Sequence, residues 1–98
     1  MKKIDILTRD AFNSNTPVRY SNTEIKVDKF YTKLFLHGNL IACKELESGL
    51  IRCNMCGWNT PTTRTRLNAI GTNVYTRKGV IYSNGSVIAS DCVWFGIN

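Results

Sequence analysis

The chain has 98 residues, of which 43% are apolar and 20% are charged, and its formal net charge at pH 7 is +6. This length predicts one folded domain, because two half-length cores would each be too small to be stable. No apolar run approaches the roughly 20 residues needed to span a bilayer, and no apolar segment follows Lys2 and Lys3 as in a secretory signal. We therefore expect a cytosolic protein with reduced cysteines and no membrane contact.

The first 23 residues carry little apolar periodicity. They contain one small apolar cluster within residues 4–7, followed by the polar run over residues 13–17. Asn, Ser and Pro in that run favour local turns over regular structure. This pattern predicts a loosely ordered N-terminal arm over residues 1–23 and a folded domain over residues 24–98.

Alternating apolar and polar residues then predict a series of short strands. Gly38-Asn39 lies between two apolar runs and suits a two-residue hairpin turn, and residues 47–49 supply a second turn. Short turns of this kind join antiparallel neighbours into a meander. The predicted strands cover residues 25–27, 31–37, 40–44 and 50–55.

Residues 60–71 have the signals of a short helix. Thr60 can cap it, Pro61 is favoured at the first helical position, and Gly71 marks its end. Trp58, just before the helix, is expected to pack into the corner between strand and helix because a Trp side chain buries so much area. The helical residues expected to face the core are Leu67, Ala69 and Ile70.

The last quarter returns to strands, predicted over residues 74–77, 80–83 and 87–95. Lys78-Gly79 and Asn84-Gly85 separate them, and Asn-Gly is among the strongest hairpin signals. The predicted fold class is α+β. It consists of an antiparallel β-meander, one short helix and a second antiparallel hairpin or meander, packed as a single small domain.

The segment from Ser48 to Ser90 contains no Asp or Glu, although it holds five cationic residues. Clustered cations without neighbouring carboxylates attract anionic partners. Aromatic residues of the segment, such as Tyr75 and Tyr82, are suited to stack on bases or to fill a protein pocket. The hydroxyls and free N–H groups at the start of the predicted helix suit phosphate. The candidate binding residues are Arg52, Thr62, Thr63, Arg64, Arg66, Tyr75, Arg77 and Lys78.

A structural alternative for the helical part of this set is an ordinary capped amphipathic helix with solvated arginines. The additional cations outside the helix favour anion binding. Both interpretations depend on whether the cations meet on one face, which the sequence leaves open.

Four cysteines form a second candidate constellation. Cys53 and Cys56 have the spacing of a zinc knuckle, for which Cys43 and Cys92 (or His37) are the available further ligands. A second paired knuckle is missing, so small buried apolar cysteines are the favoured interpretation, and no cofactor is expected. A redox centre lacks the βαβ context that it requires.

Catalysis has little support in the sequence. His37 is the only histidine, without a Ser nucleophile elbow or an evident carboxylate pair, and the acid-free segment offers no carboxylate to hold Mg²⁺. We therefore expect a protein that is not an enzyme.

Several segments resemble a family of small tailed-bacteriophage proteins. The resemblance covers about residues 22–85 and rests on Asn22-Thr23-Glu24, on residues 36–42, on residues 57–60 and 62–69, and on residues 82–85. It implies a phage accessory protein that acts in the cytoplasm of the host bacterium. It carries over no catalytic or binding residue.

The leading hypothesis is nucleic-acid binding through the basic residues, with phosphate contacts dominant and weak sequence preference. The first alternative is host takeover or anti-defence. In that case the same face would inhibit a bacterial defence protein or host enzyme by contacting its acidic surface. The second alternative is a sponge for a nucleotide signal. A homo-oligomer is compatible with each, with Trp94-Phe95 as one possible contact.

Overall fold

The computed structural model describes residues 2–97, and within them the chain forms two helices and nine strands. The predicted α+β class with an antiparallel meander is confirmed. In chain order the elements are α1 (Lys3–Asn13), β1 (Val18–Tyr20), β2 (Thr23–Val27), β3 (Tyr31–Leu36), β4 (Asn39–Glu45), β5 (Ile51–Cys53), α2 (Pro61–Ala69), β6 (Val74–Arg77), β7 (Val80–Ser83), β8 (Ser86–Ile88) and β9 (Phe95–Gly96).

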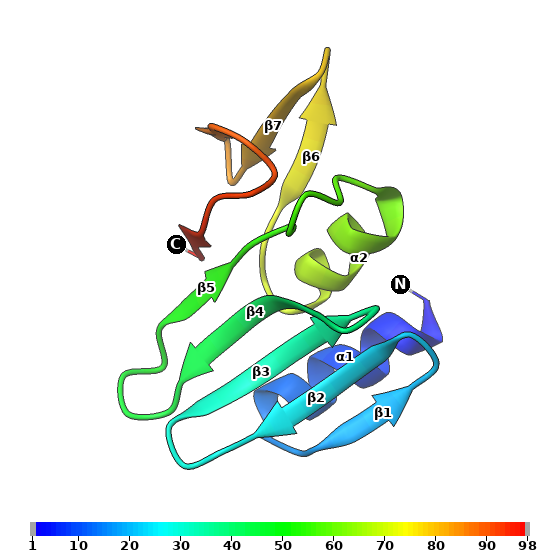
Figure 1. Ribbon diagram of the computed structural model, residues 1–98, viewed down its shortest axis with the longest axis vertical. Coiled ribbons are helices and arrows are strands. Elements are labelled where there is room, and N and C mark those ends of the chain that lie inside the picture. Colours follow the sequence, from blue (N-terminus) through cyan, green and yellow to red (C-terminus); the bar gives the residue numbers. More distant parts are fainter. Residues whose placement is uncertain (1, 98) are drawn as a thin grey trace.

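The larger sheet has six antiparallel strands in the order β1-β2-β3-β4-β5-β9. Both helices lie on the same side of it, as Figure 1 shows. The β3–β4 turn consists of His37 and Gly38 rather than the expected Gly38-Asn39, because Leu36 pairs with Asn39. His37 (φ 51°) and Gly38 (φ 79°) both have positive φ, which is the geometry of a type I′ turn.

The smaller sheet, β6-β7-β8, forms the narrow end of the molecule (Figure 1). Its turns are the predicted Lys78-Gly79 and Asn84-Gly85, both with positive φ at both central residues. The single strand expected over residues 87–95 is wrong. Strand β8 ends at Ile88, and β9 begins only at Phe95, where it pairs with β5 of the larger sheet.

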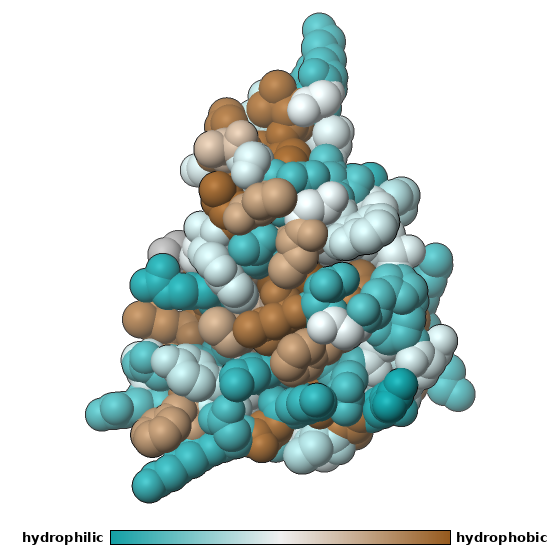
Figure 2. Space-filling view, in the orientation of Figure 1, coloured by the Kyte–Doolittle hydropathy of each residue, from teal (hydrophilic) through white to brown (hydrophobic). Residues whose placement is uncertain are grey.

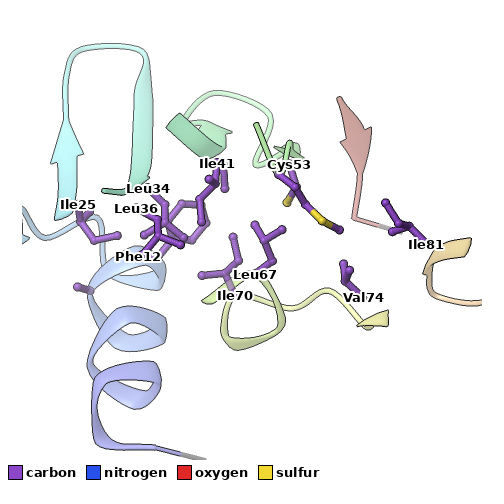
Figure 3. Close-up of a cluster of buried hydrophobic side chains, with 13 residues drawn as sticks. Phe12, Ile25, Leu34, Leu36, Ile41, Cys53, Leu67, Ile70, Val74 and Ile81 are labelled. Atoms are coloured by element: carbon purple, nitrogen blue, oxygen red, sulfur yellow. The ribbon is translucent and has the colours of Figure 1, made fainter. Parts of the chain in front are cut away.

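The core lies between the larger sheet and the two helices (Figure 3). Alternate residues of β2 and β3 face inward, since side chains in a strand point to opposite faces in turn. Phe12 points from α1 toward Leu34 and Leu36 of β3. Leu67 of α2 and Ile70, directly after that helix, point toward the strands. Leu67, Ala69 and Ile70 are buried as expected.

Helix α1 corrects the expectation of a loosely ordered arm over residues 1–23. Its buried face consists of Asp5, Thr8, Ala11 and Phe12, so half of that face is polar. The hydroxyl of Thr8 is satisfied within the helix by donating to the carbonyl of Ile4 (2.7 Å). A buried stripe whose first half is polar escapes a search for hydrophobic periodicity.

An ion pair joins the two helices inside the core. The Nη1 of Arg66 lies 2.6 Å from the Oδ1 of Asp5, and its Nε donates to the hydroxyl of Thr23 on β2 (2.9 Å). Both charged side chains are buried, with exposures of 7% and 5%. Asp5 is therefore the partner that allows a guanidinium to lie under the sheet.

Asp28 organises the β2–β3 turn and supplies a pH-dependent prediction. Its carboxylate accepts from the backbone N–H of Phe30, pairs with Lys33 (3.0 Å) and accepts from the N–H of Tyr31, which together lower its pKa from 3.8 to about 2. A lowered native pKa contributes stability that is present above pH 3.8 and is lost as the pH falls through about 2. We expect wild type to be more stable than Asp28→Asn near neutral pH. Urea titrations at a series of pH values measure the difference in free energy of unfolding between the two proteins. This difference should narrow as the pH falls from 3.8 to about 2, and a difference that stays constant would contradict the lowered pKa of Asp28.

Candidate nucleic-acid interface

The β6–β7 hairpin brings two of the predicted cations together at the projecting end of the molecule. Arg77 is the last residue of β6, Lys78 is the first residue of the turn, and both are exposed. In Figure 2 this end is hydrophilic at its tip, with hydrophobic side chains directly beside it. Neither residue forms an ion pair with a carboxylate in the part of the chain that the structure describes.

Two tyrosines form an aromatic surface on the same hairpin. Tyr75 and Tyr82 are directly opposite each other on β6 and β7, and their rings stack with centroids 5.1 Å apart and planes 13° apart. Tyr75 is 39% exposed, and Val87 of β8, which pairs with Tyr82, is 64% exposed. Strand alternation places Arg77 on the same face as Tyr75. The outer face of the small sheet thus combines stacked rings with a neighbouring cation.

Arg64 joins this region from helix α2, on the other face of the hairpin. Its Nη1 donates to the side-chain oxygen of Asn59 (2.5 Å) and to the hydroxyl of Thr76 on β6 (3.3 Å). The Thr76 hydroxyl also donates to Asn59 (3.3 Å). All these acceptors are neutral, so the positive charge of Arg64 is positioned but not neutralised.

Arg66 and Arg52 do not belong to this group. Arg66, expected on the binding surface, is buried and paired with Asp5, which corrects that expectation. Arg52 is exposed on β5, on the outer face of the larger sheet, where it pairs with Cys43 and Gly96. The five cations therefore do not gather into one patch. Three of them do lie at one hairpin: Arg77 and Lys78 are part of it, and Arg64 contacts it through Thr76.

The two threonines predicted to bind anions differ in their availability. Thr63 is buried, and its N–H and hydroxyl both contact the hydroxyl of Thr60, which caps α2 as expected. Thr62 instead lines a cavity of about 500 Å³ beside the β3–β4 turn. Trp58 forms part of the same cavity and is 61% exposed, so the expectation that it packs into the core is wrong.

Sequence reasoning missed the residues that hold these groups in place. Asn59 has no distinctive pattern, and its role follows only from the side-by-side placement of α2 and β6. The apolar cavity walls come from β3, β4 and the segment after β5, which only the folded sheet brings together. The full cavity lining is Leu36, His37, Asn39, Ile41, Met55, Trp58, Thr60, Thr62 and Thr63.

The four cysteines do not converge on a metal site. Cys53 pairs with Ala42 and faces the core, whereas Cys43 pairs with Arg52 on the outer face. Among residues 2–97 no group of three His, Cys, Asp or Glu side chains is placed to hold a metal ion. Cys56 donates to the carbonyl of Leu40 (3.0 Å).

Burial makes the cysteines differ in accessibility, which gives a further prediction. Burial raises the pKa of Cys53 to about 12, and the thiolate is the reactive form. Cys92 is exposed, although its hydrogen bond to Asp91 also raises its pKa. In maleimide labelling followed by peptide mass spectrometry, we expect Cys92 to react first and Cys53 to react only after denaturation. Replacement Cys92→Ser should remove the fastest phase, and rapid labelling of native Cys53 would contradict its placement.

Neither helix among the described residues is long and apolar enough to cross a membrane. A comparison with curated proteins and a comparison with solved structures each found no match. The phage protein family described as Kyanoviridae Gp96 protein matches residues 1–96, nearly the whole chain. This agrees with the resemblance to small tailed-phage proteins seen in the sequence. The chain therefore belongs to the Kyanoviridae Gp96 family.

Proposed function

We propose that this phage protein is a non-enzymatic accessory protein that binds nucleic acid in the host cytoplasm through its β6–β7 hairpin. The observation that carries the proposal is the exposed Tyr75–Tyr82 stack beside Arg77 and Lys78, which have no carboxylate partner among residues 2–97. Phosphates supply the opposite charge, and bases supply flat faces that stack on tyrosine.

Each group on the hairpin has a separate part in this proposal. Arg77 and Lys78 contact phosphates at the tip, and Arg64 adds a third cation from the opposite face. Tyr75 offers its exposed ring face to an unpaired base. No side chain in this group reads a base edge in a fixed geometry, so binding should depend weakly on sequence.

Fluorescence anisotropy with a labelled single-stranded DNA oligonucleotide tests the proposal. The variant Arg77→Gln/Lys78→Gln should bind at least about tenfold more weakly at 0.1 M salt, since each phosphate contact contributes to affinity through counterion release. The matched control is Arg19→Gln/Lys29→Gln, which removes the same charge from exposed positions of the larger sheet and the β2–β3 turn. If both variants lost the same affinity for the oligonucleotide, net charge alone would explain the loss, and the hairpin would not be the binding site.

The apolar surface beside the tyrosines favours a second candidate, inhibition of a bacterial defence protein or host enzyme. Val80 and Val87 are 38% and 64% exposed, and tyrosines with arginines are common at the centres of protein interfaces. A pull-down from nuclease-treated host lysate separates the candidates. One stoichiometric protein retained by wild type and lost by Tyr75→Ala would support inhibition, whereas loss of all partners after nuclease would support nucleic-acid binding.

A further inference from the structure

A cavity beside helix α2 has the volume and the lining of a small-ligand binding site. Its volume of about 500 Å³ lies within the range of about 300–1,000 Å³ that small-ligand pockets occupy. Leu36 and Ile41 of the larger sheet and Met55 after β5 supply apolar walls. Trp58 lines one side of the cavity, and 61% of this residue is exposed.

The polar groups of the cavity come from Thr, Asn and His side chains. Thr62, Asn39 and His37 are among its lining residues, and the lining includes no Asp, Glu, Lys or Arg. The Thr62 carbonyl accepts a hydrogen bond from the Thr65 hydroxyl, whereas the Thr62 hydroxyl has no hydrogen-bond partner among residues 2–97. This chemistry suits a ligand with apolar faces and a hydrogen-bonding edge, and it suits an isolated phosphate poorly.

The cavity and the hairpin share one structural element. Asn59, which lies between the cavity residues Trp58 and Thr60, accepts hydrogen bonds from Arg64 and from Thr76 of the hairpin. Of the three cations at the hairpin, Arg64 is therefore the one whose side chain contacts a neighbour of the cavity residues.

We infer that this cavity holds one unpaired nucleobase of the bound strand, stacked on Trp58 with its edge toward Thr62 and Asn39. A base meets each requirement of the lining, because its two faces are apolar, its edge carries donors and acceptors, and it is uncharged at neutral pH. The inference rests on the proposed function and names the part of the partner that the cavity recognises.

Trp58 itself can report binding. The chain has two Trp residues, so Trp94→Phe leaves Trp58 as the only one. In this background, adenosine and thymidine, added separately, should change the fluorescence of Trp58 in a saturable way, and inorganic phosphate should neither cause nor compete with the change. Thr62→Phe fills the cavity from an accessible position and should abolish the nucleoside response, whereas Thr62→Ser keeps the hydroxyl and should retain it. Thermal unfolding of the two variants verifies that both are folded.

The same variants are then titrated with the oligonucleotide. Thr62→Phe should weaken its binding roughly tenfold relative to Thr62→Ser, the effect of losing one stacked base. Absence of a saturable response to either nucleoside, or competition by phosphate, would overturn the inference. The proposed function would survive that result if Arg77→Gln/Lys78→Gln still weakened oligonucleotide binding. Nucleoside binding together with unchanged oligonucleotide affinity in that double variant would overturn the hairpin proposal and leave the cavity as a nucleobase site.

Discussion

Replacing Arg66 by Met should lower the free energy of unfolding by about 3–5 kcal/mol, since the carboxylate of Asp5 would stay buried without its partner. The Thr23 hydroxyl would also lose the hydrogen bond that it accepts from the Nε of Arg66. It would still donate to the side-chain oxygen of Asn22. Urea unfolding followed by tryptophan fluorescence measures the change.

Two controls distinguish the effect of breaking the buried ion pair from the effect of removing any arginine. Arg9→Met breaks the exposed pair with Asp10, whose side chains are 44% and 61% exposed, and should cost at most about 1 kcal/mol. The double variant Asp5→Leu/Arg66→Met removes both buried charges and should recover most of the lost stability. A single Arg66→Met variant as stable as Arg9→Met would contradict the structural role of the pair.

Replacing Tyr75 by Ala should weaken binding of single-stranded DNA by at least about fivefold and leave binding of a duplex of the same length almost unchanged. Stacking of one base on an aromatic side chain contributes about 1–3 kcal/mol, and only an unpaired base can reach the ring. Parallel anisotropy titrations with the two forms of DNA measure the difference.

Tyr31→Ala is the matched control for this prediction, because Tyr31 is 37% exposed, close to the 39% of Tyr75, but lies on the larger sheet. It should bind both forms of DNA as wild type does. A similar loss in the two tyrosine variants, or an equal loss for single strand and duplex in Tyr75→Ala, would argue against stacking at the hairpin.

The fold was most predictable where local chemistry decides the geometry. The turns Lys78-Gly79 and Asn84-Gly85, the Thr60 cap and the alternation of β3 all follow from residues close in the sequence. Strand β9 was not predictable, because Phe95 and Gly96 pair with β5, more than 40 residues earlier, and too few residues form the strand to show a period.

Helix α1 and the fate of Arg66 have a common cause. Asp5 makes the buried face of α1 polar, and Arg66 makes a core position of α2 charged, so each residue looks solvent-exposed when taken alone. They satisfy each other across 61 residues of sequence, a pairing that no local pattern indicates.

The candidate site was predictable in part. Tyr75, Arg77 and Lys78 are neighbours in sequence, and a hairpin necessarily keeps them together. The absence of acidic residues in its segment groups Arg52 with them, and the position at the start of the predicted helix groups Thr62 with them. Both are properties of the sequence and not of a surface. The structure distributes these two residues to the larger sheet and to the cavity.

The salt dependence of oligonucleotide affinity tests the central claim most directly. If Arg64, Arg77 and Lys78 contact phosphates, the logarithm of the association constant should fall with the logarithm of salt concentration with a slope of about −2 for a single strand. In Arg77→Gln/Lys78→Gln the slope should be shallower by about 1.4. Affinity that hardly changes between about 50 and 200 mM salt, or an unchanged slope in the double variant, would contradict phosphate binding by these cations.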